Sequence, residues 1–412
     1  MRCTCLRRKR DRQAQTGLGV SSHRPRCLAK FKENQIIKYL CYTALVSYFR
    51  GGALDKNSIF SRLESLKNSI EKNQSFVLDD FKEDDALGAT LSYYIVYGNS
   101  FPYDGVYSVE RTIEEVRNKT KYAVVARTPK GDIVGISAIY TCAPNPKIYE
   151  LGGLVVIPDY RNKDLAKQLM RYTLEVLAKR NKVEVLFGEA VTHHTITQKM
   201  IDGYGYRASG AEFNSLLVKA SKDSNELCKT TVFLVFIINK DIEHSVFLPS
   251  IYKSFIEYVI NVHNLTRAIA WIDEATAETP SDSAKTDCSQ FYYEPSKTLK
   301  ITINSIGLDL VKEIEKISSS FGLLNSIQII LKSFSKYTPW AVFELRKNKF
   351  SLGGMLPLWF SEGDGFFIQK ASAQPEFDKM QLFSEVAKKV IEYTKEDWNK
   401  IGECPIHRPE VV

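Results

Sequence analysis

The stretch Leu154 to Met170, LVVIPDYRNKDLAKQLM, joins an apolar strand to an amphipathic helix within a few residues. Aliphatic and β-branched residues over 149–157 predict a strand, and Pro158, which has no N–H to donate, ends its ladder. Over 162–180 the apolar residues recur at helical spacing, which predicts a helix. The apolar face of that helix consists of Leu165, Leu169, Val176 and Leu177.

Positive charge gathers where this helix begins. The first turn of a helix has N–H groups without intrahelical partners, and the helix dipole adds partial positive charge. Arg161, Lys163 and Lys167 place formal charge around the same turn. The junction therefore predicts a site for a phosphate-bearing ligand, with the edge of the preceding strand free to pair with an amide-containing arm. A strand–helix joint without a ligand is the plainer alternative.

The junction lies inside a longer alternation of elements. Between residues 80 and 240 the apolar periodicity predicts an ααβββαβαββ order. This order indicates an α/β fold with one mixed, mostly antiparallel sheet flanked by helices. The expected helices are 84–97, 109–118, 162–180 and 195–202, and the expected strands are 122–127, 133–140, 149–157, 183–191, 212–219 and 229–239.

The charge of the 412-residue chain is unevenly distributed. Its formal net charge is +8, but residues 1–32 carry ten Lys or Arg and one Asp, so the remainder is close to neutral. Nucleic acid is therefore not an expected partner. We expect residues 1–35 to form a basic, disordered head or an artefactual upstream extension. A targeting segment is less favoured because no apolar stretch follows the charges, and a nucleic-acid-binding arm because no aromatic residues interleave them.

The hydropathy and the cysteines of the sequence predict where the protein is found in the cell. No run of roughly 18 apolar residues occurs, so we expect no membrane partner. The eight cysteines are scattered apart from Cys3 and Cys5, which fits neither a disulfide framework nor a metal site. We therefore expect free thiols, no metal and a cytoplasmic location.

The junction resembles motif A of the GNAT-type N-acetyltransferase superfamily. The family pattern is Arg or Gln, two variable residues, Gly, one variable residue, then Gly or Ala; here it falls on Arg161-Asn162-Lys163-Asp164-Leu165-Ala166. The resemblance covers about 80–240 and implies a GNAT fold with acetyl-CoA as acyl donor. It implies that this loop holds the pyrophosphate and that the strand edge pairs with pantetheine. The remaining implied contacts are Leu154, Val155, Val156 and, on the short helix, Gln198.

One residue departs from the family pattern. Asp164 stands at the central glycine, where Gly would let the backbone approach phosphate and a carboxylate repels it. The repulsion is about 1 kcal/mol at contact distance in water, and the neighbouring cations oppose it. We expect weakened rather than abolished binding of acetyl-CoA.

Acetyl transfer to an amine needs a base for the proton of the amine. Glu150 lies on the predicted strand among apolar residues, which raise a carboxyl pKa, and the resemblance implies a base there. A solvent-facing strand surface is its alternative role. Glu189, on the adjacent predicted strand, is a second candidate, either as base or as a carboxylate that binds a cationic substrate.

The proton donor for the departing thiolate is less well defined. The resemblance implies a tyrosine four residues before the glycine of a Tyr-x-x-x-Gly-Phe motif, but Ile201 occupies that position and Tyr206 the phenylalanine position. Tyr204 is the substitute candidate, with core packing as its alternative role. Without a tyrosine, solvent would protonate the thiolate.

The remainder of the chain predicts a second, smaller α/β unit. The segment SLGGMLPLWFSEGDGFFIQK (351–370) resembles the last hairpins of a GNAT fold, but no motif A helix precedes it. We therefore expect a tandem arrangement, with a degenerate GNAT-like domain that has no cofactor of its own and walls the substrate cleft or mediates homodimer formation. A helix is expected at 249–270 and a strand at 341–346. The expected divisions are a helical N-terminal segment at 36–79, the GNAT domain at 80–240, a helix and polar linker at 241–297, the second domain at 298–400 and a tail at 401–412.

These observations favour an acyl-CoA-dependent N-acyltransferase. We expect it to transfer an acetyl group from acetyl-CoA to an amine by direct attack in a ternary complex. The acceptor would be an amine-bearing small molecule or a peptide. The alternative is a catalytically impaired GNAT-like binding or regulatory module, which Asp164 and the missing tyrosine favour.

Overall fold

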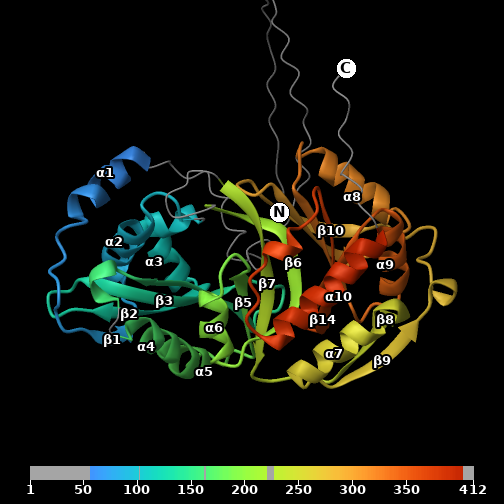
Figure 1. Ribbon diagram of the computed structural model, residues 1–412, viewed down its shortest axis with the longest axis horizontal. Coiled ribbons are helices and arrows are strands. Elements are labelled where there is room, and N and C mark those ends of the chain that lie inside the picture. Colours follow the sequence, from blue (N-terminus) through green and yellow to red (C-terminus); the bar gives the residue numbers. More distant parts are fainter. Residues whose placement is uncertain (1–55, 102, 162–163, 220–226, 402–412) are drawn as a thin grey trace, which may run out of the picture. The chain divides into compact units, whose positions relative to one another are not determined.

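One sheet of 12 strands organises the part of the chain that the computed structural model describes, residues 56–101, 103–161, 164–219 and 227–401 (Figure 1). All of these residues belong to one compact unit, Ile37–Val412. The strands of its first half are β1 (Val77–Asp80), β2 (Lys121–Arg127), β3 (Ile133–Thr141), β4 (Ile148–Val156), β5 (Val185–Val191), β6 (Arg207–Lys219) and β7 (Leu227–Ile238). Those of its second half are β10 (Asp287–Tyr293), β11 (Thr298–Ser305), β12 (Ser326–Lys332), β13 (Ser351–Phe360) and β14 (Gly363–Ala371).

The first half confirms the predicted ααβββαβαββ order. The strands lie in the order β1-β2-β3-β4-β5-β7-β6, and only β4 and β5 are parallel neighbours. A π-helical turn at Thr173–Leu177 interrupts the long helix after β4. The helices are α1 (Lys56–Leu66), α2 (Ala86–Tyr97), α3 (Val109–Arg117), α4 (Leu165–Tyr172), α5 (Ala178–Arg180) and α6 (Ile196–Asp202). Of the predicted N-terminal helical segment, residues 36–55 lie outside the described residues, and α1 and β1 occupy the rest.

Helices cover both faces of this half. On one face, α2 buries Leu91 and Tyr93, and the 3₁₀ turn before α3 buries Tyr107, against alternate residues of β2 and β3. On the other face, α4 packs Leu165 and Leu169 against the sheet, as its predicted apolar face requires. Val176, expected on the same face, is instead 38% exposed, because the π-helical turn shifts the helical phase there.

The parallel pairing of β4 and β5 is short. It consists of Ile148 with Val185, Tyr149 with Leu186 and Glu150 with Phe187, and the ladder between the described residues of these strands stops there. On its other side β4 continues to pair with β3 as far as Val156, with a bulge at Gly153. The two strands therefore part beyond Glu150, and we call this opening the fork.

Gly153 holds the bulge beside the fork. Its φ is +63°, a left-handed conformation that favours glycine, and a Cβ there would collide with the Tyr93 hydroxyl. Tyr93 Oη donates a hydrogen bond to the Gly153 carbonyl oxygen over 2.9 Å. The bulge thus depends on both residues.

The second half contains elements that the sequence analysis misassigned. The helix expected at 249–270 is α7 (Lys253–His263) alone, and it lies between β8 (His244–Pro249) and β9 (Arg267–Ile272), which form a separate 2-stranded parallel sheet. The polar segment expected as a linker contains β10. The strand expected at 341–346 is wrong; it is part of α9 (Thr338–Lys347), since a short apolar run fits either period and Pro339 favours a helix start.

The second half repeats the strand order and register of the first. β10, β11, β12, β14 and β13 are neighbours in the same sequence as β3, β4, β5, β7 and β6. β5 pairs residues 185–191 with 238–232, and β12 pairs residues 326–332 with 371–365. We call β3–β7 the first repeat and β10–β14 the second repeat.

Irregularities in the two repeats also coincide. The register of β6 shifts between Ala208 and Gly210 and again between Glu212 and Leu216. That of β13 shifts between Leu352 and Gly354 and again between Leu356 and Phe360, with the same spacing. Asn214 and Leu358, at the equivalent position in each strand, have left-handed φ angles of 54° and 53°. Shared bulges of this kind indicate one backbone plan used twice.

The helices follow the same plan. α8 (Leu310–Ser319) connects β11 to β12 as α4 leads from β4 towards β5, and α9 connects β12 to β13 as α6 connects β5 to β6. In the second half α8 thus occupies the place that α4 occupies in the first. The chain ends its described part with α10 (Glu385–Ile401), which packs on β6 and β13 (Figure 1).

The two repeats meet through equivalent strands. β6 and β13 are antiparallel, and their paired residues are Gly210 and Gly354, which are themselves equivalent. A Cβ on Gly210 would lie 2.7 Å from the Gly353 carbonyl oxygen, so the two backbones need glycine here. An arrangement in which equivalent residues contact each other has local two-fold character.

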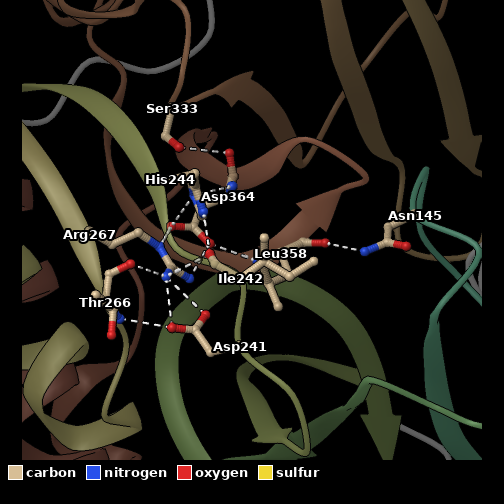
Figure 2. Close-up of polar contacts among 9 residues, drawn as sticks. All are labelled: Asn145, Asp241, Ile242, His244, Thr266, Arg267, Ser333, Leu358 and Asp364. Atoms are coloured by element: carbon tan, nitrogen blue, oxygen red, sulfur yellow. Dashed lines mark hydrogen bonds and ion pairs between the residues drawn. The ribbon is translucent and has the colours of Figure 1, made fainter.

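A buried ionic cluster holds the turn of the second repeat at Leu358 (Figure 2). Asp364 Oδ1 accepts a hydrogen bond from the Leu358 N–H over 2.7 Å, and Asn145 Nδ2 donates to the Leu358 carbonyl oxygen over 2.9 Å. Arg267 Nε and Nη2 donate to Asp364 over 2.6 and 3.0 Å, and both side chains are fully buried. The left-handed Leu358 is thereby fixed from three elements.

We expect Asp364→Ala to lower the free energy of unfolding by about 3–5 kcal/mol, because it leaves the Arg267 charge buried without this partner. Urea unfolding measures the change. Glu278→Ala, which removes an exposed ion pair with Lys336, is the control and should change stability by less than about 0.5 kcal/mol. Equal effects of the two substitutions would contradict this account of the cluster.

Candidate active site at the fork

The start of α4 is built around Asp164. Its φ of 53° is left-handed, the conformation for which glycine is favoured at that position of the family pattern, and Asp tolerates it better than most residues. The carboxylate is 73% exposed and its Oδ1 lies 3.1 Å from Lys167 Nζ. Asp164 therefore adopts a backbone conformation that glycine also favours, and its charge is partly balanced by Lys167.

The other residues expected to bind the cofactor surround this turn. Arg161 follows a 3₁₀ turn at Pro158–Tyr160, and its Nε donates to the Val156 carbonyl oxygen over 3.2 Å. Leu165 is buried, so only its backbone faces the turn. Leu154, Val155 and Val156 form the end of β4 beyond the fork, and Ala166 lies in the first turn of α4. Asn162 and Lys163 lie outside the described residues.

Gln198 is committed to other contacts. The residue is 6% exposed, and its Nε2 donates to the carbonyl oxygens of Val191, His194 and Gln381 over 2.8–3.1 Å. Its Oε1 accepts from the Phe383 N–H over 3.0 Å. The side chain thus ties α6 to the end of β5 and to the segment before α10, and its contact with a cofactor stays a prediction.

Glu150 is the last β4 residue before the fork. It is 4% exposed, so the solvent-facing alternative is wrong. It lies opposite Tyr140 of β3, which in turn lies opposite Lys121 of β2. Lys121 is 1% exposed, with Nζ 3.7 Å from Glu115 Oε2, and burial lowers its pKa. A row of buried polar side chains therefore leads across the sheet to the fork.

Glu189 lies on β5 past Phe187, in the part of the strand that no longer pairs with β4. Burial raises its pKa to about 7; the ammonium of Lys300 acts in the opposite direction, and Glu212 raises it further. Lys300 belongs to β11 of the second repeat, and its Nζ lies 3.6 Å from Glu189 Oε1. A carboxyl group that titrates near neutrality suits both proton transfer and the binding of an amine.

Tyr204 does not face these carboxylates through its hydroxyl. Its Oη donates to the Lys167 carbonyl oxygen over 3.1 Å, which ties the loop before β6 to α4. Its role as proton donor stays a prediction.

Tyr206 was missed as a feature of the site. The residue is 2% exposed, its ring packs over Gly188, the first β5 residue beyond the fork, and its hydroxyl has no hydrogen-bond partner among the described residues. Burial raises the pKa of this phenol well above its usual value, and Glu150 adds to the shift. Nothing in the sequence signals an unpartnered hydroxyl.

We expect Tyr206→Phe to raise the free energy of unfolding by about 1–2 kcal/mol, because it removes a buried hydroxyl that has no partner. Thermal and urea unfolding measure the change. The matched control is Tyr252→Phe, which removes a buried hydroxyl that contacts Asp397 Oδ2 over 3.0 Å and should lower stability. A loss of stability in both variants would show that the Tyr206 hydroxyl is hydrogen-bonded.

The first half is an α/β domain with one mixed sheet, and comparison with known proteins identifies a family for part of it. Residues 68–206 match the family model described as acetyltransferase (GNAT) family. The match identifies a GNAT acetyltransferase domain in this part of the chain. No curated protein matches the chain.

Solved structures similar to the chain include three acetyltransferases. The ribosomal-protein-S5-alanine acetyltransferase of Vibrio fischeri is 13% identical with a TM-score of 0.34, covering 42% of this chain and 97% of its own. An N-acetyltransferase of Staphylococcus aureus Mu50 is 18% identical with a TM-score of 0.32, covering 40% and 99%. The yncA structure of Salmonella typhimurium, which contains its cofactor acetyl-CoA, is 11% identical with a TM-score of 0.33, covering 41% and 96%.

Among the described helices, none has the length and apolar character needed to cross a membrane. The same part of the chain contains no group of three or more His, Cys, Asp or Glu side chains placed to hold a metal ion.

Proposed function

We propose that the chain is an acetyl-CoA-dependent N-acetyltransferase whose donor substrate lies in the fork. The observation that carries the proposal is the end of the β4–β5 ladder at Glu150 and Phe187, directly before the helix-start motif at Arg161. Backbone groups of β4 from 151 to 156 that face β5 are left for a ligand with amide groups. A diphosphate would meet the first-turn N–H groups of α4 and the Arg161 guanidinium. The residues present therefore fit acetyl-CoA.

The chemistry then depends on the two carboxylates. Acetyl-CoA supplies an activated thioester carbonyl to the site. Glu189 binds the nitrogen of the acceptor amine, and Glu150 receives the proton that the amine loses as the C–N bond forms. The C–S bond breaks and solvent protonates the thiolate, because the Tyr204 hydroxyl is bound to the Lys167 carbonyl oxygen.

We propose that the second half, at 298–400, is a degenerate GNAT-like unit without an acetyl-CoA site. Its β11–β12 ladder continues through five pairs, from Thr298 with Ser326 to Thr302 with Ile330, where the first repeat has already parted. The loop before α8 is also covered. The Thr286 N–H donates to Asp309 Oδ1 over 2.8 Å, and the Gly307 N–H donates to Thr286 Oγ1 over 3.1 Å.

The second candidate function is a GNAT-like binding or regulatory module with impaired catalysis. Asp164 favours it, because the carboxylate adds negative charge where a diphosphate would bind. Binding and turnover measured on the same protein separate the two candidates.

Calorimetric titration with acetyl-CoA is expected to show saturable binding, and no heat at millimolar concentration would overturn the proposal. Asp164→Gly should tighten binding roughly fivefold, since it removes repulsion of about 1 kcal/mol. Asp378→Gly, an equal charge change at a 98% exposed residue of the second half, is the control and should leave the affinity unchanged. Weaker binding by Asp164→Gly would contradict the role given to the carboxylate.

Glu150→Gln should reduce kcat by roughly 10²–10⁴-fold while leaving acetyl-CoA affinity unchanged, because the amide keeps the shape but accepts no proton. Mass spectrometry detects acetylated product from ethanolamine, putrescine or a peptide with an N-terminal alanine. Glu175→Gln, an exposed residue of the helix after β4, is the matched control. Wild-type turnover in Glu150→Gln would remove Glu150 from the mechanism.

A further inference from the structure

The equivalent positions around the contact between β6 and β13 differ sharply in polarity. In the first repeat Phe187 and Phe236 are paired on β5 and β7, and their equivalents on β12 and β14 are Gln328 and Gln369. Conversely, Ile330 and Leu356 of the second repeat are equivalent to Glu189 and Glu212 of the first. Phe187, Phe236, Ile330 and Leu356 share one apolar cluster. The other member of each equivalent pair is polar: Glu189, Glu212, Gln328 and Gln369.

Lys300 belongs to the polar set. It pairs with Gln328 between β11 and β12 just as Glu150 pairs with Phe187 between β4 and β5. The position that carries the candidate base in the first repeat therefore carries an ammonium group in the second. Its side chain is directed to the carboxylates of the first repeat rather than to a fork of its own.

The contacts of Lys300 are short and buried. Its Nζ lies 2.7 Å from Glu212 Oε1 and 3.6 Å from Glu189 Oε1, with 15% of the side chain exposed. Gln328 Nε2 donates to Glu212 Oε2 over 3.1 Å. Glu189 Oε1 and Gln328 Oε1 are buried and accept no hydrogen bond from the described residues. One cation thus serves two carboxylates, and acceptor atoms remain for an N–H donor.

The protonation of Glu189 depends on its burial and on the charged groups around it. The groups that face it are the Lys300 ammonium from β11, the Glu212 carboxylate from β6 and the Tyr293 phenol from β10, whose pKa rises to about 12 through burial and through Glu189. Burial and Glu212 favour the neutral acid, and Lys300 favours the carboxylate. Loss of Lys300 would therefore raise the pKa of Glu189 further.

We propose that Lys300 is a positioning residue through which the second repeat completes the acceptor site: its ammonium group lies between Glu212 and Glu189 and favours the charged form of Glu189, which binds the nitrogen of the incoming amine. The inference rests on the proposed acetyl transfer. Glu212 holds Lys300 in place, and Glu189 Oε1 and Gln328 Oε1, which accept no hydrogen bond from the described residues, accept hydrogen bonds from the amine. The second repeat has no donor-substrate site in this scheme; it supplies charge to the site of the first.

Three variants test the inference by the direction of their effects. Lys300→Met should shift the acid limb of kcat/KM for the amine upward by about one pH unit or more, a loss of about tenfold on that limb. Glu212→Gln should shift the same limb to lower pH, because it removes the negative charge of Glu212 beside Glu189 while the positive charge of Lys300 remains. Lys300→Arg should keep the wild-type profile. All three should bind acetyl-CoA as the wild type does.

Carbon-13 NMR titration of the glutamate carboxyls provides a readout without turnover, with Glu189 assigned by its absence in Glu189→Gln. The signal should move to higher pH in Lys300→Met and to lower pH in Glu212→Gln. If Lys300→Met fails to fold, the direction in which the pKa of Glu189 moves in Glu212→Gln still tests the inference. An unchanged titration of Glu189, or shifts in one direction for both variants, would overturn the inference.

Failure of the proposed function has a different signature. If the wild-type chain acetylates none of the three probe amines, the proposed function fails. If it acetylates one of them and Lys300→Met retains the wild-type pH profile, this inference alone fails.

Discussion

The antiparallel contact of β6 with β13 at Gly210 and Gly354 is the interaction on which the arrangement depends. It converts two half-sheets into one sheet and brings equivalent strands together about a local two-fold axis. Because the contact is backbone to backbone, it needs glycine on both strands. From it follow the placement of Lys300 beside Glu189 and of Asn145 beside Leu358.

One backbone plan serves two purposes in this chain. In the first repeat, β4 and β5 part after Glu150, and the helix that follows begins at the left-handed residue Asp164. In the second repeat the same two strands stay paired, and the loop before α8 is occupied by Thr286. The difference arises from a few ladder hydrogen bonds and one covering segment rather than from a change of topology.

The order of the helices and strands between residues 80 and 240 was predicted correctly from the sequence, and that of the second half only in part. Pro158, the periodicity of Leu165 and Leu169, and the motif around Asp164 are local signals, and local signals predict elements. The misassignment of 341–346 arose because a short apolar run fits a strand or a helix. A tandem arrangement was expected from the segment 351–370, but the equivalence of individual positions could not be read, since Glu150 and Lys300, or Phe187 and Gln328, share no chemistry and only backbone hydrogen bonds relate them. The Lys300–Glu189 contact joins residues far apart in the chain and could not be read locally.

A continuous sheet also has a consequence for how the molecule holds together. Neither repeat could be excised without exposing the unpaired edge of β6 or β13, and Val232 to Phe236 directly beside β6 are apolar. Bare edges next to apolar strands invite intermolecular association. During synthesis, the edge of β6 in the first half therefore stays unpaired until β13 of the second half has been made.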